Sequence, residues 1–326
     1  MALTLILFVL GFIILIKGAD ILILGSSSIA KKLGISTFVI GLTIVAFGTS
    51  APELAVSVMA NINGNVGIAM GNIIGSNITN ILLILGVAAI IRPLIIKKAT
   101  INKEIPLSLL AVLALTILAN DSIIDKILPN GLTRIDGLIL ILFFSIFIYY
   151  TFGIAKSSES LAEEVTGKIK GENAKEYRNS VSATMIIVGL VGLYQGGVWI
   201  VDGATVIAHF FGISEAVIGL SIVALGTSLP ELAASGMAAY RGKTDMAIGN
   251  VVGSNIFNIL WVLGLSAIIN PIAFNDKLNF DILLLFIINM ILVFLIFIGK
   301  KNVLARKEGV SLVIMYVLYI IYLFIL

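Results

Sequence analysis

The amino-acid sequence predicts an all-α polytopic membrane protein whose ten transmembrane helices form two inverted five-helix repeats. Hydrophobic residues make up 59% of the 326 positions and charged residues only 12%, whereas soluble domains carry about 25% charged residues. The mean hydropathy is +1.14. Apolar stretches long enough to cross a bilayer recur along the whole chain, and one long segment is repeated in the second half.

This composition excludes an ordinary soluble enzyme and a disordered protein. The chain has no cysteine, so disulfides and thiolate-bound metals are excluded. Its net charge of +3 is explained by loop lysines and arginines, and no basic patch predicts a nucleic-acid partner. Residues Met1 to Ile16 are apolar without a positive leading region, which indicates a first membrane span and not a cleaved signal peptide.

A membrane helix needs about 20 largely apolar residues, and ten stretches have this character. In the first half they cover residues 2–30, 36–61, 66–91, 101–119 and 133–154. In the second half they cover residues 181–208, 214–240, 245–270, 278–299 and 309–326. The longest polar stretch lies between the halves. We therefore expect a first repeat at 1–154, a solvated linker at 155–180 and a second repeat at 181–326.

The basic residues predict the orientation of these spans. With the N-terminus outside, 17 of the 21 lysines and arginines fall in cytoplasmic loops or the linker and 3 in outer loops. Cytoplasmic loops carry such an excess. The sequence therefore predicts a plasma-membrane protein with both termini outside and the linker inside.

The internal repeat is the strongest feature of the sequence. Shifted by 178 positions, Gly41–Pro93 aligns with Gly219–Pro271 without a gap, and 32 of the 53 positions are identical. Because each half has an odd number of spans, the two halves enter the membrane from opposite sides. Inverted repeats of this kind build many secondary transporters, whose sites lie near the bilayer midplane where the halves meet.

Each repeat places a glutamate inside a span, in the phrase Gly-Thr-Ser-x-Pro-Glu that ends at Glu53 and at Glu231. The preceding proline lacks an N–H and breaks the helix, which frees backbone carbonyls around Ala46–Thr49 and Ala224–Thr227. A carboxylate in hydrocarbon is costly and usually marks a functional path. Carbonyl oxygens beside two carboxylates therefore predict a cation site.

The following span of each repeat adds a polar stripe, because its members are four residues apart and share one helix face. The stripe consists of Asn72, Ser76 and Asn80, and of their repeat mates Asn250, Ser254 and Asn258. Taken singly, such residues are more often interhelical hydrogen bonds, and the glycines beside them are more often packing contacts. Taken together, the donors are all oxygens, which favours Ca²⁺ or Na⁺ over zinc or copper.

Other polar residues receive structural interpretations. Lys17 and Asp20 are three apart on one helix, which predicts a local ion pair. Asp202 lies in the equivalent span near the outer surface, but its repeat mate is Leu24. The single histidine, His209, falls at a span end and is interpreted as an interface residue.

With these residues in view, the whole chain resembles the sodium/calcium exchanger family of the cation/Ca²⁺ exchanger superfamily, of the prokaryotic and archaeal type. The resemblance is most specific in the repeats GTSAPE…GNIIGSNITN and GTSLPE…GNVVGSNIFN. It implies ten helices with four ion sites between the second, third, seventh and eighth. It also implies that the first and sixth helices slide as a pair and open the site to one side at a time. The implied ligands are the carboxylates of Glu53 and Glu231, the carbonyls of Thr49, Thr227, Ala46 and Ala224, and the side chains of Ser50, Ser228, Ser76, Ser254, Asn80 and Asn258.

The sequence departs from part of this family at Asn258, where many relatives, including the potassium-dependent branch, carry aspartate. We expect an electrogenic Na⁺/Ca²⁺ antiporter. The alternatives left open are H⁺/Ca²⁺ exchange with the same glutamates and K⁺-dependent Na⁺/Ca²⁺ exchange. Ca²⁺, Na⁺ and the lipid bilayer are the expected partners, with no cofactor, and the chain is expected to act as a monomer.

An intramembrane enzyme is not expected, because the sequence has no HExxH, no GxGD and no nucleophile–histidine pair. A passive channel is disfavoured by the inverted repeat, which is typical of transporters.

Overall fold

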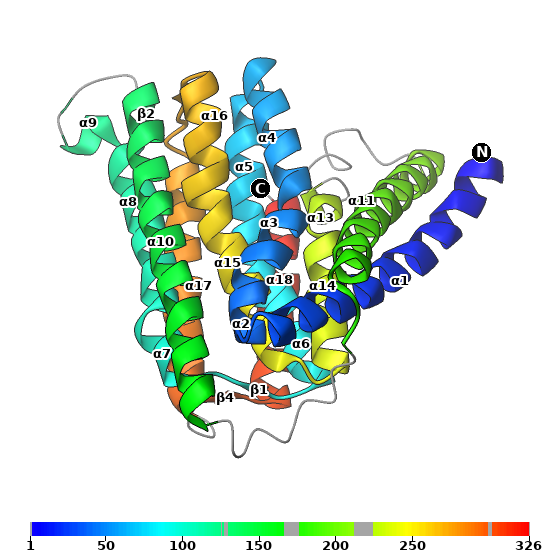
Figure 1. Ribbon diagram of the computed structural model, residues 1–326. Coiled ribbons are helices and arrows are strands. Elements are labelled where there is room, and N and C mark those ends of the chain that lie inside the picture. The colour runs from blue at the N-terminus through cyan, green and yellow to red at the C-terminus, as the bar shows by residue number, and fades with distance from the viewer. Residues whose placement is uncertain are drawn as a thin grey trace.

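The computed structural model describes residues 2–124, 126, 130–165, 176–211, 224–298 and 302–325. The first half contains α1 (Ala2–Lys32), α2 (Thr37–Ile40), η1 (Gly41–Val45), α3 (Ala46–Thr49), α4 (Ala51–Ile62), α5 (Val66–Thr79), η2 (Asn80–Ile84), α6 (Leu85–Ile91), α7 (Lys98–Asn102), α8 (Glu104–Leu118), α9 (Asp121–Ile124) and α10 (Arg134–Val165). The second half contains α11 (Asn179–Phe210), α13 (Ala224–Thr227), α14 (Leu229–Tyr240), α15 (Thr244–Ile256), η4 (Phe257–Leu263), α16 (Gly264–Ile269), α17 (Leu278–Ile298) and α18 (Arg306–Ile325). The described part of the chain is thus all-α apart from four two-residue strands (Figure 1).

Among the described residues, seven helices are long and apolar enough to cross a membrane. The bent pair of helices Thr37–Thr49 and Ala51–Ile62 makes an eighth span if counted as one. The other two predicted spans correspond to α13 with α14, and to α18. Residues 214–223 of the predicted span 214–240, and residues 166–175 of the predicted linker, lie outside the described residues.

Helix α10 continues through Val165 and so includes the first residues of the predicted linker. The residues after position 154 include strong helix formers such as Ala, Glu and Leu, so the end of the apolar stretch does not end the helix.

Two continuous helical spans form the centre of the bundle. Val66–Ile91 and Thr244–Ile269 are 78% buried over their most apolar windows, whereas the other spans are 28–39% buried. These two spans carry the polar stripe of each repeat. The stripe therefore faces protein and not lipid.

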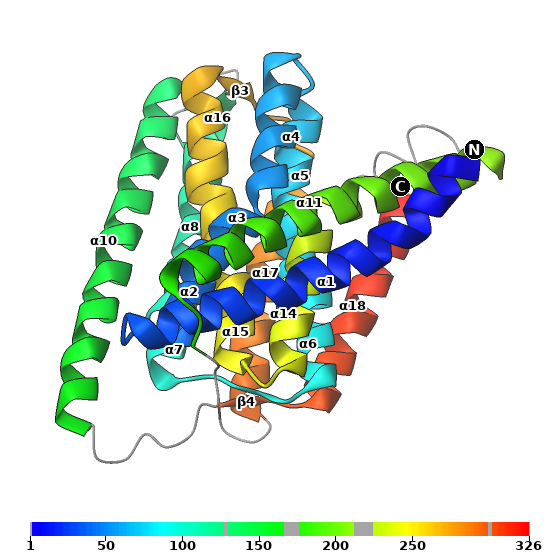
Figure 2. The same cartoon turned by 45° about the vertical axis from the view of Figure 1, so that its right-hand side comes forward.

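The helices α1 and α11 lie side by side and cross the rest of the bundle at a slant (Figure 2). Their backbones approach closely at Gly18, where a Cβ atom would lie 2.8 Å from the Leu193 nitrogen and 2.9 Å from the Gly189 carbonyl oxygen. Small residues permit this approach in membrane helix pairs.

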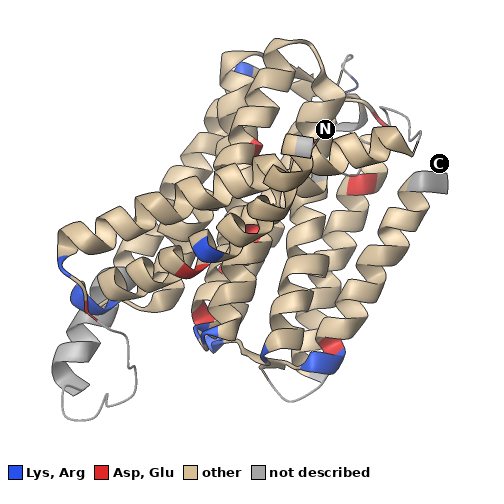
Figure 3. Ribbon diagram, turned by 90° about the vertical axis from the view of Figure 1, so that its right-hand side faces the viewer, with Lys and Arg blue, Asp and Glu red and all other residues tan. Residues whose placement is uncertain are grey.

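Short antiparallel strand pairs join the two halves. Strand β1 (Leu94–Ile95) pairs with β4 (Val303–Leu304), and β2 (Gly131–Leu132) pairs with β3 (Ile272–Ala273). Lysines and arginines gather at the end of the bundle that carries β1 and β4 (Figure 3).

Candidate cation site

Both glutamates lie in the first turn of a helix that begins directly after a break. Ser50 separates α3 from α4 with φ −82° and ψ 6°, and Ser228 precedes α14 with φ −87° and ψ 2°. The break at Ser50 bends helix Ala51–Ile62 by 42° from helix Thr37–Thr49. Proline is tolerated at the start of α4 and α14 because its missing N–H has no helical partner there. The positive end of each helix dipole therefore lies beside a carboxylate, which it stabilises.

The two carboxylates are held crosswise by the opposite half of the chain. The Ser50 hydroxyl donates to Glu231 Oε1 at 3.1 Å, and the Ser228 hydroxyl donates to Glu53 Oε1 at 3.4 Å. Each glutamate is 1% exposed. Both carboxylates thus lie inside the protein at the junction of the two repeats, and neither faces lipid.

The polar stripe adds two serines that differ between the repeats. The Ser76 hydroxyl donates to Glu53 Oε1 at 3.5 Å, and its oxygen lies 3.2 Å from the Ser228 oxygen. Its repeat mate Ser254 is buried, and its Oγ has no hydrogen-bond partner among the described residues. The surroundings of the two glutamates are therefore related by symmetry but not identical.

Four asparagines bond across the two central helices. Asn80 Nδ2 donates to Asn255 Oδ1 and Asn258 Nδ2 donates to Asn77 Oδ1, each at 3.0 Å. These bonds hold the amide nitrogens of Asn80 and Asn258 toward the neighbouring central helix. The oxygen of each amide therefore points away from that bond, in a fixed direction. Sequence reasoning missed Asn77 and Asn255. The repeat contained the signal, because both lie in its identical Gly-Ser-Asn phrase.

The two asparagines implied as ligands also lie where the helix changes its hydrogen-bond pattern. Asn80 is the first residue of η2 and Asn258 the second residue of η4, and both segments are π-helical. Such segments in α-helices occur frequently at functional sites.

Hydroxyls at the ends of α3 and α13 bond to the central helices. Thr49 Oγ1 donates to Asn250 Oδ1 at 3.3 Å, and Thr227 Oγ1 donates to Asn72 Oδ1 at 3.1 Å. The two bonds are repeat mates, and each fixes a helix break against the polar stripe.

The two alanines implied as carbonyl ligands differ in their surroundings. The Ala46 carbonyl accepts the Ser50 N–H at 3.0 Å. In the second repeat, the Ser228 N–H bonds to the Leu225 carbonyl at 3.1 Å, so it leaves the carbonyl of Ala224, the first residue of α13, to other partners.

Five buried oxygens of this region have no hydrogen-bond partner among the described residues. They are Glu53 Oε2, Glu231 Oε2, Asn80 Oδ1, Asn258 Oδ1 and Ser254 Oγ. A buried carboxylate oxygen without a partner is costly. No group of three or more His, Cys, Asp or Glu side chains that could hold a metal ion occurs in the described parts of the chain. The donor set thus combines two carboxylates with neutral oxygens, which suits hard cations such as Ca²⁺ and Na⁺.

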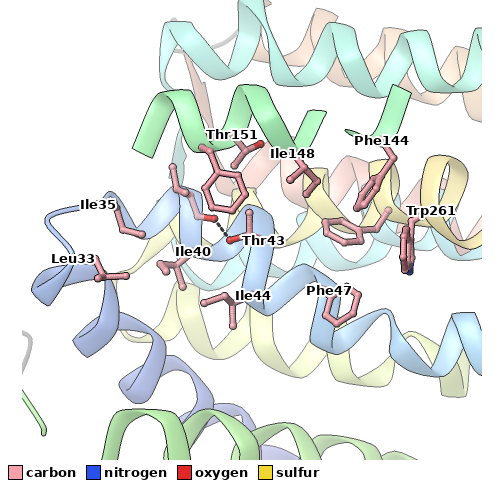
Figure 4. Close-up of a pocket in the computed structure, with 13 residues that line it drawn as sticks. Leu33, Ile35, Ile40, Thr43, Ile44, Phe47, Phe144, Ile148, Thr151 and Trp261 are labelled. Atoms are coloured by element: carbon pink, nitrogen blue, oxygen red, sulfur yellow. Dashed lines mark hydrogen bonds between the residues drawn. The ribbon is translucent and has the colours of Figure 1, made fainter. Parts of the chain in front are cut away.

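An apolar cavity lies apart from the two glutamates. It measures about 490 Å³ and lies between α10, η4 and the segment from Leu33 to Phe47 (Figure 4). Its hydroxyls, on Thr43 and Thr151, donate to carbonyls of their own helices. The remaining lining is apolar, including Phe144 and Trp261. This cavity offers no cluster of oxygen ligands and is distinct from the cation site.

The predicted ion pair between Lys17 and Asp20 is wrong. Asp20 pairs with the Arg241 guanidinium, which directly follows α14, and this contact raises the pKa of Arg241. Since α14 packs against α1, the arginine reaches the carboxylate from another helix, while Lys17 is exposed. Sequence spacing alone could not identify this partner.

The sequence is similar to those of known proteins. The family model described as sodium/calcium exchanger protein matches residues 3–153 and 181–325. The chain is 34% identical over 350 residues to the sodium/calcium exchanger MaX1 of Methanosarcina acetivorans, with 97% of each chain covered. It is 35% identical over 266 residues to the inner membrane protein YrbG of Escherichia coli, covering 81% of this chain and 79% of the relative.

The fold is also similar to solved structures. The sodium-calcium exchanger NCX_Mj soaked with zero Na⁺ and Ca²⁺ superposes with a TM-score of 0.81 at 34% identity, covering 98% of this chain and 99% of that chain. The same exchanger soaked with 2.5 mM Na⁺ and 0.1 mM Ca²⁺ gives a TM-score of 0.79 at 35% identity, covering 98% and 97%.

Proposed function

The chain belongs to the sodium/calcium exchanger family, and from this premise we propose that it is an electrogenic secondary antiporter that exchanges Na⁺ for Ca²⁺ by alternating access. Membership of the family makes it an ion antiporter and not an enzyme. The specific ions, the ligands and the direction of coupling belong to the proposal.

The observation that carries the proposal is the set of five buried oxygens without hydrogen-bond partners among the described residues, which includes one oxygen of each glutamate. Two carboxylates balance one Ca²⁺, and calcium takes 6–8 oxygens. The remaining ligands in the proposal are the carbonyls of Thr49, Thr227, Ala46 and Ala224 and the side chains of Ser50, Ser228, Ser76, Ser254, Asn80 and Asn258. The solved exchanger NCX_Mj was soaked with Na⁺ and Ca²⁺, which supports the same ions here.

Exchange without leak follows from competition for Glu53 and Glu231. Both ions need these carboxylates ionised, so bound Ca²⁺ and bound Na⁺ exclude one another. If several Na⁺ exchange for one Ca²⁺, net charge crosses the membrane at about 2.3 kcal/mol per charge per 100 mV. The membrane potential then contributes to the driving force.

The moving part in this proposal is the α1–α11 pair. The two helices contact each other more extensively than any other pair of described elements. Sliding of this pair across the bundle would open the site to one side at a time.

We further propose that the protein lies in the plasma membrane with both termini outside and acts as a monomer. YrbG is an inner membrane protein, which supports the location. The positive end of the bundle, with β1 and β4, is then cytoplasmic. Residues 1–154 and 181–326 form the two repeats and 155–180 the linker.

The proposal is tested with the full chain in proteoliposomes. An outward Na⁺ gradient should drive ⁴⁵Ca²⁺ uptake, and both Glu53→Gln and Glu231→Gln should abolish it. The matched control is Glu176→Gln, which removes an exposed carboxylate that pairs with Lys31. Undiminished exchange in either site variant would refute the assignment.

The alternatives are separated in the same vesicles. Uptake driven by a pH gradient in Na⁺-free buffer would select H⁺/Ca²⁺ exchange. Uptake that requires added K⁺ would select K⁺-dependent exchange. The absence of a carboxylate at Asn258 supports K⁺ independence.

A further inference from the structure

A second, smaller cavity lies against the two helix breaks. It measures about 190 Å³ and is lined by one face of α11 and by the residues around both prolines. The α11 face consists of Tyr194, Gly197, Val198, Val201 and Asp202, whose spacing of three and four places them on one side of the helix. At about 30 Å³ per molecule the cavity has room for about six waters, the size of a hydrated cation.

The cavity leads to the proposed cation site. Pro52 and Pro230, which directly precede the two glutamates, both line it. Thr227 also lines it, and its hydroxyl bonds to Asn72 of the polar stripe. The cavity therefore adjoins the helix breaks that precede both glutamates.

Asp202 is the only acidic or basic side chain among the described residues that line this cavity. It is exposed, and no hydrogen bond or ion pair to another described residue neutralises it. It lies in the last third of α11, on the side of the membrane where that helix ends. In the proposed orientation this side is extracellular.

We propose that Asp202 is a specificity-determining residue at the outer mouth of the transport path, where its carboxylate concentrates divalent over monovalent cations. This inference depends on the proposed function. A cleft lined by one sign of charge raises the local concentration of counter-ions. The concentration factor for an ion of charge two is the square of the factor for an ion of charge one, so Ca²⁺ gains more than Na⁺.

The inverted repeat does not carry the acidic side chain of Asp202 over to its mate. The repeat mate of Asp202 is Leu24, which lies on α1. The corresponding position toward the cytoplasm therefore lacks a carboxylate. Asp202 should raise the local Ca²⁺ concentration at the outer face. The repeat-related position at the inner face has no carboxylate that would do the same.

The test uses Na⁺-loaded right-side-out membrane vesicles that contain the full chain, with ⁴⁵Ca²⁺ added outside. Ionic strength is set with osmotically balanced N-methylglucamine chloride at ~10 mM or ~1 M, where charges are screened over about 30 Å and about 3 Å. Asp202→Asn should raise the half-saturating external Ca²⁺ about tenfold at low ionic strength and less than about twofold at high ionic strength. The maximal rate should not change.

Three further measurements define the effect. The external Na⁺ concentration that half-inhibits Ca²⁺ uptake should rise only about threefold in Asp202→Asn. This is the square root of the effect on Ca²⁺, because Na⁺ carries one charge and Ca²⁺ carries two. Asp202→Glu, which keeps the charge, should behave as the wild type. In inverted vesicles Asp202→Asn should leave the half-saturating Ca²⁺ unchanged.

The matched control is Asp121→Asn. It also removes a charge from the β2–β3 end of the bundle, but it lies on α9, at the opposite edge from α11 (Figure 1). An equal shift in Asp121→Asn, a shift that persists at ~1 M salt, or no shift in Asp202→Asn would each overturn the role of Asp202.

A gain of charge provides a second test if Asp202→Asn does not fold. Val198→Asp adds a carboxylate one turn away on the same cavity wall and should lower the half-saturating external Ca²⁺ at low ionic strength. An unchanged value would overturn the inference. A wild-type protein that takes up no Ca²⁺ contradicts the proposed function itself, whereas an active wild type with an identical Asp202→Asn variant contradicts only this inference.

Discussion

Ser50 Oγ donates to Glu231 Oε1 across 3.1 Å, so a hydroxyl from the first repeat holds the carboxylate of the second. The mirror-related bond from Ser228 to Glu53 measures 3.4 Å. Each break in a transmembrane helix thus supplies both an acid and the partner of the opposite acid. The positions of the two carboxylates depend on how the two repeats dock, and not on either repeat alone.

Removing either crosswise hydroxyl should weaken cation binding. A hydrogen bond to a charged group contributes about 1.5–3 kcal/mol, so Ser50→Ala or Ser228→Ala should raise the half-saturating Ca²⁺ and Na⁺ at least about tenfold. The measurement is the concentration dependence of exchange in proteoliposomes. Ser145→Ala is the control, because the Ser145 hydroxyl bonds only to its own helix. Wild-type concentrations for both site variants would contradict the crosswise arrangement as a binding feature.

Replacing Asn77 or Asn255 should weaken ion binding, although their side chains bond to other asparagines and are not proposed as ligands. Each accepts an amide N–H of a ligand asparagine, so Asn77→Ala or Asn255→Ala releases the oxygen of Asn258 or Asn80 from its fixed direction. Loss of such a buried bond costs about 1–3 kcal/mol, and we expect the half-saturating Ca²⁺ to rise at least about fivefold.

The control for these two variants is Asn289→Ala. Asn289 is buried in α17 and donates to the carbonyl of Leu285 in its own helix. Asn289→Ala should lower thermal stability without changing the half-saturating Ca²⁺. A similar Ca²⁺ effect in all three variants would mean that general loosening, and not ligand direction, explains the result.

The repeat made much of this arrangement predictable. A 178-residue offset that preserves Pro-Glu and Gly-Ser-Asn identifies the paired positions, and the apolar lengths identify the spans. The burial of Glu53 and Glu231 follows from the cost of exposing a carboxylate to hydrocarbon. Fold class and acidic centre could therefore be predicted before any coordinates.

Other features could not be predicted, for physical reasons. Two nearly identical repeats do not reveal whether Ser50 bonds to the glutamate of its own half or of the other half. The π-helical segments at Asn80 and Asn258 have no composition that marks them, since they depend on packing. Asp20 pairs with a residue 221 positions away and not with Lys17, because tertiary contacts decide between equally charged partners.

The ion pair between Asp20 and Arg241 should bias the position of α1 against the bundle. Its side chains are 23% and 37% exposed, so its contribution is at most about 1 kcal/mol, or about fivefold in a conformational equilibrium. The chain has no cysteine, so Val201→Cys, on the wall of the smaller cavity, reports access by its rate of thiol labelling. Asp20→Asn should change that rate up to about fivefold.

A double-mutant cycle tests whether the two charges act together. Arg241→Gln should have the same effect as Asp20→Asn, and the double variant should have no greater effect than either. Lys97→Gln is the control, because it breaks the 2.6 Å pair with Asp245 of α15 and leaves the contacts of α1 intact. Additive effects of the two site variants would show that the pair does not hold α1.

Both stability and transport should depend on the close packing of α1 on α11. At Gly18 any side chain would meet the backbone of α11 at 2.8–2.9 Å, so Gly18→Val must separate the helices. Overpacking of this kind costs about 1–3 kcal/mol, and we expect a lower midpoint of thermal unfolding in detergent together with slower exchange. Gly67→Ala is the control, since no described atom outside its own helix turn lies within 4 Å of the added carbon and alanine favours helix by up to about 1 kcal/mol. Because a loose pair cannot move as one body, Gly18→Val with a wild-type exchange rate would contradict the proposal that α1 and α11 slide together.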